Sequence, residues 1–235
     1  MGFTFVSENA SELPAAVRKA ADAVCQLKTA DSSATTATNI ARDMVLTAGH
    51  TMQFKESAAL MLAVYNLRKD RDANSRQVFG LHPYQHRGGF HYSRKSTEGS
   101  QNILKLNDEK RMDFAICRVR QSRQKLYSGD EPRGFVKVAA PPHGTLAQEQ
   151  VFLIAHQGRT SPFQAFSVGT LTVGVGEFFF AHTAAGQMGD SGAPVFDVDG
   201  NLIGIHVANV DGVKIACRAD KILAALNAAV PDGWK

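Results

Sequence analysis

Short apolar runs separated by turn residues dominate the chain. They fall at residues 24–27, 60–66, 136–139, 151–155 and 166–173, and Gly, Pro, Asn or Asp punctuates the sequence between them. Apolar runs bounded by turn residues predict buried β-strands, and a succession of such strands predicts β-barrels. The pattern therefore indicates an all-β protein, and a length of 235 residues suits a single unit of that class.

Two segments near the ends follow a helical pattern instead. The sequence S-E-L-P at 11–14 is typical of a helix start, and an alanine-rich stretch follows it at 15–23. Residues 220–230 place Ile222, Leu223, Leu226 and Val230 on one face of a second helix. Between these helices, the glycine- and proline-containing stretch at 127–146 interrupts the strands and predicts a linker.

One serine lies in a turn rich in glycine. The sequence G-Q-M-G-D-S-G-A-P at 186–194 flanks Ser191 with Gly189 and Gly192, and glycine permits backbone conformations closed to other residues. The N–H groups of Gly189 and Ser191 could then form an oxyanion hole, as acyl transfer to a serine requires. Taken alone, the motif is equally compatible with an ordinary surface turn.

A nucleophilic serine needs a histidine base and a carboxylate that orients it. The apolar run at 44–46 leads into T-A-G-H, which ends in His50. The acidic candidates between His50 and Ser191 are Asp70, Asp72, Asp108, Asp113 and Asp130. We choose Asp113 because the buried strand Phe114-Ala115-Ile116 follows it directly. Asp108 is the second choice, and the other three lie in polar loop sequence.

The motifs T-A-G-H and G-D-S-G-A-P, in this order and far apart, resemble those of chymotrypsin-like serine proteases. The acid of that family stands in a similar D-F-A-I setting, and the resemblance covers most of the chain. It implies two six-stranded antiparallel β-barrels with short N-terminal and C-terminal helices. We expect a helical segment (1–23), a barrel carrying His50 and Asp113 (24–126), the linker (127–146), a barrel carrying Ser191 (147–218), and a helix with a tail (219–235).

The same resemblance suggests which peptide bond is cut. The strand G-I-H-V-A resembles the S1-pocket strand of viral 3C-like proteases and of glutamyl endopeptidases, in which a histidine recognises Glu or Gln at P1. Carried over, that residue is His206, whose imidazole can hydrogen-bond a carboxamide or a carboxylate. Trypsins carry an aspartate six residues before the serine, where this chain has Ala185, so a preference for Arg or Lys is not expected. The alternative is that His206 is a buried core histidine.

Further substrate contacts follow from the resemblance and from strand geometry. Thr183 is a candidate second contact to the P1 side chain. Residues Val207, Ala208 and Asn209 offer an edge to which a substrate could add as a strand. Three histidines, His82, His86 and His91, match no zinc-site spacing, so neither a metal nor another cofactor is expected.

The sequence thus predicts a serine endopeptidase that acts through an acyl-enzyme on a protein or polyprotein substrate. The similarity to 3C-like enzymes favours a viral polyprotein-processing protease. One alternative is a free-standing intracellular bacterial peptidase. The other is a protease-like module that binds RNA or protein without turnover.

Charge and cysteine content bear on partners and location. In picornaviral 3C proteases, RNA binds a basic segment after the strand of the catalytic acid, and the comparable residues here are Arg118, Arg120, Arg123 and Lys125. RNA binding and a solvated loop are both compatible with this cluster. Three cysteines, with no signal-peptide pattern and no apolar membrane segment, favour a reducing compartment. We expect a cytoplasmic protein, in the host cytoplasm if viral.

Overall fold

Successive side chains of a strand point to opposite faces of the sheet. Both faces are buried here, one inside a barrel and the other between the barrels, which explains why the apolar runs of the sequence are continuous. The structure is a computed structural model. It describes residues 2–7, 10–29, 34–52, 58–83, 85–86, 89–90, 112–120, 127–128, 131–132, 134–142, 149–156, 161, 163–172, 176–187 and 189–229. Within these ranges, no helix has the length and apolar character needed to cross a membrane.

The first half of the chain forms a closed barrel with strand order β2-β3-β4-β9-β6-β5. Its strands are β2 (Val24–Lys28), β3 (Ala34–Ala41), β4 (Met44–Thr47), β5 (Leu62–Tyr65), β6 (Gln77–Pro83) and β9 (Ala115–Val119). Two 3-10 turns, η2 (Gly49–Thr51) and η3 (Ala73–Ser75), join strands of this barrel. Two short pairs, β7 (Gln85–His86) with β8 (Gly89–Phe90) and β10 (Tyr127–Ser128) with β11 (Glu131–Pro132), lie outside it.

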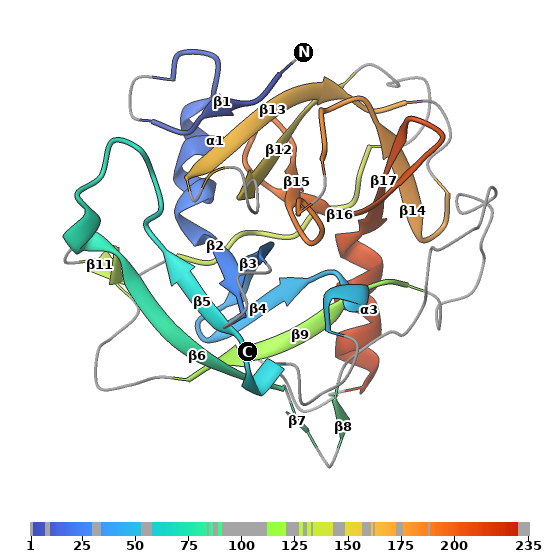
Figure 1. Ribbon diagram of the computed structural model, residues 1–235. Helices are drawn as coiled ribbons and strands as arrows, with labels where there is room; N and C mark the ends of the chain where they lie inside the picture. The colour runs from blue at the N-terminus through green and yellow to red at the C-terminus, as the bar shows by residue number, and fades with distance from the viewer. Residues whose placement is uncertain are drawn as a thin grey trace.

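The second half forms another barrel. Its strands are β12 (Gln150–His156), β13 (Gln164–Thr170), β14 (Phe179–His182), β15 (Pro194–Phe196), β16 (Leu202–Val210) and β17 (Val213–Arg218). They pair in the order β13-β12-β15-β16-β17-β14, and a bridge from Leu171 to His182 connects the two ends. The expected architecture of two six-stranded barrels is therefore confirmed. Figure 1 shows the second barrel, yellow to red, above the first, blue to green.

The two ends of the chain both attach to the second barrel. Strand β1 (Thr4–Phe5) pairs with β13 and extends that sheet, a pairing that the sequence did not indicate. Helix α1 (Ala15–Ala20) continues as the 3-10 turn η1 (Ala21–Ala23) over the stretch predicted to be helical. Helix α3 (Ala219–Ala229) starts where β17 ends and buries Ile222 and Leu226 (Figure 1).

Strand alternation divides the apolar side chains among three clusters. In β4, Val45 points into the first barrel, whereas Met44 and Leu46 face a central cluster between the barrels. In β12, Leu153 points into the second barrel, whereas Phe152 and Ile154 face the same central cluster. The barrels are therefore joined by a continuous apolar interface, to which the N-terminal segment and α3 also contribute.

One predicted strand is absent. The run at 136–139 makes a single bridge, from Val138 to Leu202, and lies outside the named strands. Hydrogen bonds from Leu202 N–H to the Lys137 carbonyl and from Ala139 N–H to the Leu202 carbonyl hold it against β16. This contact covers the apolar side chains of the run. The sequence pattern of the run is therefore that of a strand, although the run does not extend a sheet.

Candidate active site

Strand pairing in the first barrel brings His50 and Asp113 together. His50 lies in η2, directly after β4, and Asp113 lies directly before β9. Strands β4 and β9 are antiparallel neighbours in which Thr47 stands opposite Ala115, so the end of one strand meets the start of the other. Ser191 comes from the second barrel, in the turn between β14 and β15, so the three residues meet where the barrels face each other.

The three side chains form a continuous hydrogen-bonded row. His50 Nδ1 lies 2.6 Å from Asp113 Oδ2, and His50 Nε2 lies 2.8 Å from Ser191 Oγ. The backbone N–H of His50 also donates to Asp113 Oδ1 at 2.7 Å. With the ring proton on Nδ1, His50 donates to the carboxylate, and its Nε2 accepts from the serine hydroxyl. The imidazole is 37% exposed and the carboxylate 1%, so Asp113 is shielded from water while His50 remains accessible.

The turn that carries Ser191 is hydrogen-bonded to strands of both barrels. The Ser191 carbonyl accepts from the Thr36 N–H at 3.1 Å and from the Thr35 hydroxyl, both on β3. On the other side, the Gly192 N–H donates to the His206 carbonyl on β16 at 2.8 Å. The turn requires glycine, because Gly189 has φ 101° and Gly192 has φ 80°.

The N–H groups expected to form the oxyanion hole are those of Gly189 and Ser191. Neither donates to another residue in the part of the chain that the structure describes. They are therefore available to a substrate oxygen, which is what oxyanion stabilisation requires of a backbone donor.

Asp190, next to the serine, is a buried carboxyl group. Its Oδ2 accepts from the Gln187 N–H at 2.7 Å, while its Oδ1 has no hydrogen-bond partner among the described residues. Burial raises the pKa of Asp190 to about 7, although the Gln187 hydrogen bond and the charge of Lys214 act in the opposite direction. A protonated Asp190 is therefore well populated near neutral pH.

His206 is buried beside a second histidine that the sequence analysis did not single out. The His206 Nδ1 lies 3.4 Å from His182 Nε2, and the two rings meet edge to face with centroids 5.5 Å apart. Burial lowers the pKa of His206 to about 4 and that of His182 to about 3, and the charge of Lys214 contributes to both shifts. Both imidazoles are therefore neutral at pH 7, when one ring can donate to the other.

Strand register explains why His182 and Lys214 were missed. Lys214 on β17 stands opposite His182 on β14 and opposite Asn209 on β16. In the sequence, His182 and Lys214 are each a single polar residue beside an apolar run, which does not by itself indicate a binding site. Their proximity to His206 depends on pairings between strands distant in sequence, which no local pattern specifies.

The remaining candidate substrate residues lie on β16 and on the segment between β14 and the serine turn. The Ala185 carbonyl accepts from the Ser167 hydroxyl at 2.8 Å. The Thr183 hydroxyl accepts from the Thr170 N–H at 2.8 Å and lies 3.2 Å from the Thr170 hydroxyl, so it already has partners within the protein. On β16, pairing with β15 ends at Ile205, which leaves Ala208 and Asn209 paired only on the β17 side, while Val207 lies at the register shift between His206 and Ala208.

Other candidates of the sequence lie elsewhere. Asp70 lies 3.6 Å from Arg68, and Asp72 accepts from the Asn74 N–H, whereas the carboxylate bonded to His50 is that of Asp113. Arg118 lies 3.5 Å from Asp43, and Arg120 is exposed. The residues Asp108, Asp130, Arg123 and Lys125, and the side chains of His86 and His91, lie outside the described part of the chain. The described side chains contain no group of three or more His, Cys, Asp or Glu arranged to hold a metal.

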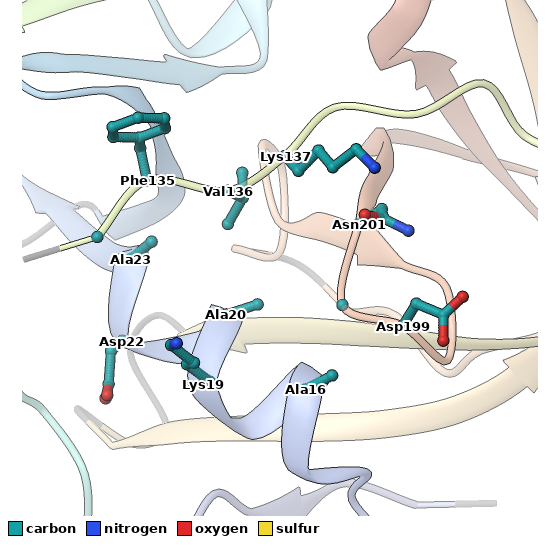
Figure 2. A pocket seen from close by; sticks show the side chains of 12 residues that line it. Ala16, Lys19, Ala20, Asp22, Ala23, Phe135, Val136, Lys137, Asp199 and Asn201 are labelled. Atoms are coloured by element: carbon teal, nitrogen blue, oxygen red, sulfur yellow. The ribbon is translucent and has the colours of Figure 1, made fainter.

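A separate hollow of about 750 Å³ lies between the N-terminal helix and the second barrel. Figure 2 shows Lys19 and Asp22 on one side of it, Phe135 and Lys137 on the connecting segment, and Asp199 on the turn before β16. None of its lining residues belongs to the His50, Asp113 and Ser191 row or to the surroundings of His206. It is therefore distinct from the candidate active site.

Comparisons with known proteins show the family and the fold. The model of the trypsin-like peptidase domain matches residues 35–205, a span that contains His50, Asp113 and Ser191. No curated protein sequence matches the chain significantly.

Two solved structures share the fold at low sequence identity. The HtrA-type protease AlgW, solved with a tripeptide, is 18% identical, with a TM-score of 0.57 over 93% of this chain and 63% of that chain. The chain thus spans slightly less than two thirds of the AlgW chain. Rv3671c from M. tuberculosis H37Rv, solved as an inactive serine-to-alanine mutant, is 14% identical, with a TM-score of 0.60 over 100% of this chain and 99% of that chain. Because the family match runs from β3 into β16 and covers more than half of the chain, the chain belongs to the trypsin-like peptidase family, and the two solved structures share its fold.

Proposed function

We propose that Ser191 is the nucleophile of this protease, His50 its general base and acid, and Asp113 the residue that orients His50. The observation that carries the proposal is the unbroken row of contacts from Asp113 Oδ2 through His50 to Ser191 Oγ, at 2.6 and 2.8 Å. A nucleophile, a base within hydrogen-bond reach and a third group orienting the base are what acyl transfer to serine requires.

Acylation follows from these positions. Ser191 Oγ attacks the scissile carbonyl carbon while His50 Nε2 takes the hydroxyl proton. The buried Asp113 carboxylate accepts a hydrogen bond from His50 Nδ1–H and stabilises the imidazolium. The N–H groups of Gly189 and Ser191 donate to the negative oxygen of the tetrahedral intermediate. When the C–N bond breaks, His50 gives its proton to the leaving amine.

Deacylation uses the same groups again. His50 removes a proton from a water molecule, which attacks the ester carbonyl carbon of the acyl-enzyme. The C–O bond to Ser191 breaks, His50 returns the proton to Oγ, and the carboxylic acid product leaves. No cofactor takes part in this cycle.

The proposal extends to a P1 preference for Glu or Gln. His206 Nδ1 faces His182, so its Nε2 is the atom left to meet a ligand. When His182 Nε2–H donates to His206 Nδ1, the proton of His206 lies on Nε2 and can be donated to a substrate oxygen. The charge of His50 is one of the causes that lower the pKa of His206, consistent with a site adjacent to the catalytic row.

The substrate backbone would bind along β16. Residues Val207, Ala208 and Asn209 lack a described partner strand on the β15 side. An extended peptide can add there as a strand through main-chain hydrogen bonds. The P1 side chain would then enter beside His206 while its carbonyl reaches Ser191.

A fluorophosphonate probe tests the assignment of the nucleophile. The protein should be labelled covalently at Ser191, and Ser191→Ala should abolish labelling and reduce peptide hydrolysis by a factor on the order of 10⁶. Ser75→Ala, which removes an exposed hydroxyl in η3, is the matched control and should label like the wild type. Persistent labelling of Ser191→Ala would contradict the proposal.

The P1 preference is tested separately with a proteome-derived peptide library whose cleavage sites are read by mass spectrometry. We expect cleavage after Glu or Gln, and loss of that preference in His206→Leu. Cleavage mainly after Arg or after bulky aromatic residues would contradict the role of His206 and leave the assignment of Ser191 intact.

As a biological role, a free-standing bacterial peptidase is supported by the two structural neighbours, one an HtrA-type protease and the other from M. tuberculosis. The viral polyprotein-processing role and the cytoplasmic location remain predictions. A module without turnover is disfavoured, because it would not need the hydrogen-bonded row. RNA binding through Arg118, Arg120, Arg123 and Lys125 also remains a prediction.

A further inference from the structure

Lys214 occupies a central place among the strands that surround His206. Strand β17 lies between β14 and β16, and Lys214 stands opposite His182 on one neighbour and opposite Asn209 on the other. Lys214 therefore lies between His182, the second buried histidine, and the edge of β16 that is proposed to bind substrate. Its side chain is half-buried, unlike that of Val213, which precedes it and is exposed.

The segment before the nucleophile shows where the Lys214 side chain lies. At Gly186, an added Cβ would stand 3.3 Å from His206 Nε2 and 3.7 Å from Lys214 Cδ. The free nitrogen of His206 and the aliphatic stem of Lys214 therefore face the same point on this segment. A side chain at this position would crowd His206, so glycine keeps the segment close to both side chains.

The charge of Lys214 has no neutralising carboxylate in contact with it within the described part of the chain. Among the described residues, no acidic side chain forms an ion pair with Lys214. Asp190 is close enough for Lys214 to influence its pKa, yet burial raises that pKa to about 7, so Asp190 is mostly uncharged at pH 6 and carries only part of its charge at pH 7. A positive charge held in a pocket without a full partner favours an anionic ligand.

Neutral histidines by themselves would not distinguish Glu from Gln. A neutral imidazole can hydrogen-bond either a carboxylate or a carboxamide. A lysine ammonium group is a donor with a full positive charge, so it favours the carboxylate by charge as well as by hydrogen bonding.

We propose that Lys214 and His206 together bind a carboxylate at P1, so that this protease cleaves after glutamate in preference to glutamine. The inference rests on the proposed role of His206 in the S1 pocket and adds the residue that decides between its two candidate side chains. In the bound complex, His206 Nε2 donates to one carboxylate oxygen and the Lys214 ammonium group to the other.

The test compares kcat/KM for peptide pairs that differ only in Glu or Gln at P1, taken from the cleavage sites of the library. For the wild type at pH 6, where Asp190 is mostly protonated, we expect a Glu-to-Gln ratio of at least about 10, since removing a charged hydrogen bond typically changes binding by that order. Lys214→Met should bring the ratio close to one, and Lys214→Arg should retain the preference for Glu. Lys137→Met, which removes an exposed lysine on the connecting segment, should leave the ratio at the wild-type value.

The outcomes separate this inference from the proposed function. Equal cleavage after Glu and Gln by the wild type, or an equal loss for both peptides in Lys214→Met, would overturn the role of Lys214 while probe labelling of Ser191 continues. If Lys214→Met fails to fold, Lys214→Arg and Lys214→Gln provide the comparison, because arginine keeps the charge and glutamine removes it. Absence of cleavage throughout the library would overturn both proposals.

Discussion

Asp190, the residue next to the nucleophile, is a buried carboxyl group with a raised pKa. In secreted members of the family, the acid before the serine pairs with a newly cleaved N-terminus, and the chain lacks the I-V-G-G motif of that activation site. Here the carboxyl group is fully buried, with one oxygen bonded to Gln187 N–H and the other without a described partner. Burial without a cation in contact accounts for its raised pKa.

The raised pKa of Asp190 predicts a specific pH dependence of stability. Between its ordinary pKa near 4 and about 7, the folded protein retains a proton that the unfolded chain has lost, so the contribution of Asp190 to stability falls as pH rises through this window. Asp190→Asn lacks this effect. Its free energy of unfolding relative to wild type should therefore rise by about 2–3 kcal/mol between pH 5 and 7.5.

Urea unfolding at several pH values measures this difference. Asp199→Asn, which changes an exposed side chain in the turn before β16, is the control, and its difference from wild type should stay flat over the same range. A flat profile for Asp190→Asn as well would show that Asp190 is ionised in the folded protein at pH 5.

At the scale of elements, the turn that carries Ser191 is hydrogen-bonded to β3 of one barrel and to β16 of the other. Within this turn, Gly192 packs closely against backbone and side-chain atoms of the first barrel. An added Cβ there would stand 2.2 Å from the Thr36 carbonyl oxygen, 2.2 Å from Thr47 Oγ1 and 2.9 Å from the Ala48 nitrogen. Two of these three atoms belong to the backbone, which a side-chain rotation cannot relieve. The geometry of the nucleophile therefore depends on the packing of both barrels.

Replacement of this glycine should affect both stability and activity. Gly192→Ala should destabilise the protein by about 3 kcal/mol or more, because it adds a clash with backbone atoms to the cost of a positive φ. It should also slow probe labelling of Ser191. Gly212→Ala is the matched control, since Gly212 has φ 85° but nothing within 4 Å of an added Cβ. Gly212→Ala should lower the free energy of unfolding by about 1–2 kcal/mol. Equal costs in the two variants would refute a steric role for Gly192.

At the scale of the whole molecule, the central apolar cluster joins both barrels into one cooperative unit. It takes Met44 and Leu46 from the first barrel, Phe152 and Ile154 from the second, and Leu226 from α3. Separation of the barrels would expose all of these groups to water, at a cost of about 25 cal/mol for each Å² of apolar surface. The barrels should therefore unfold together.

The three cysteines report on this cooperativity. Cys25 and Cys117 lie inside the first barrel, Cys217 lies in the central cluster, and all three are buried thiols that form no disulfide. Burial raises the pKa of Cys117 to about 12 and that of Cys217 above its usual value, which suppresses the reactive thiolates.

A thiol reagent should therefore react with none of the cysteines in the native protein. Along a urea series read by mass spectrometry, all three should become reactive with the same midpoint. Reaction of Cys217 at lower urea than Cys25 and Cys117 would show that the interface between the barrels opens before the first barrel unfolds.

The sequence by itself indicated most of the strands, the fold class and the candidates for the catalytic row. Turn residues and apolar runs are local signals: His50 follows an apolar run, Asp113 precedes one, and Ser191 lies in a glycine-rich turn. The motif order then indicated the family, which the family match bears out.

Only the tertiary structure decided which residues surround His206. A shift in register between His206 and Ala208, and the pairing of β17 with both β14 and β16, bring His182 and Lys214 to the site. The pairing of β1 with β13 and the contact of the 136–139 run with β16 were likewise not readable from the sequence. Register depends on the simultaneous packing of distant strands, because a shift of one residue would turn every side chain of a strand to its other face. The sequence could therefore supply the chemistry of cleavage, whereas the pairing of strands determined the surroundings that we expect to select the substrate.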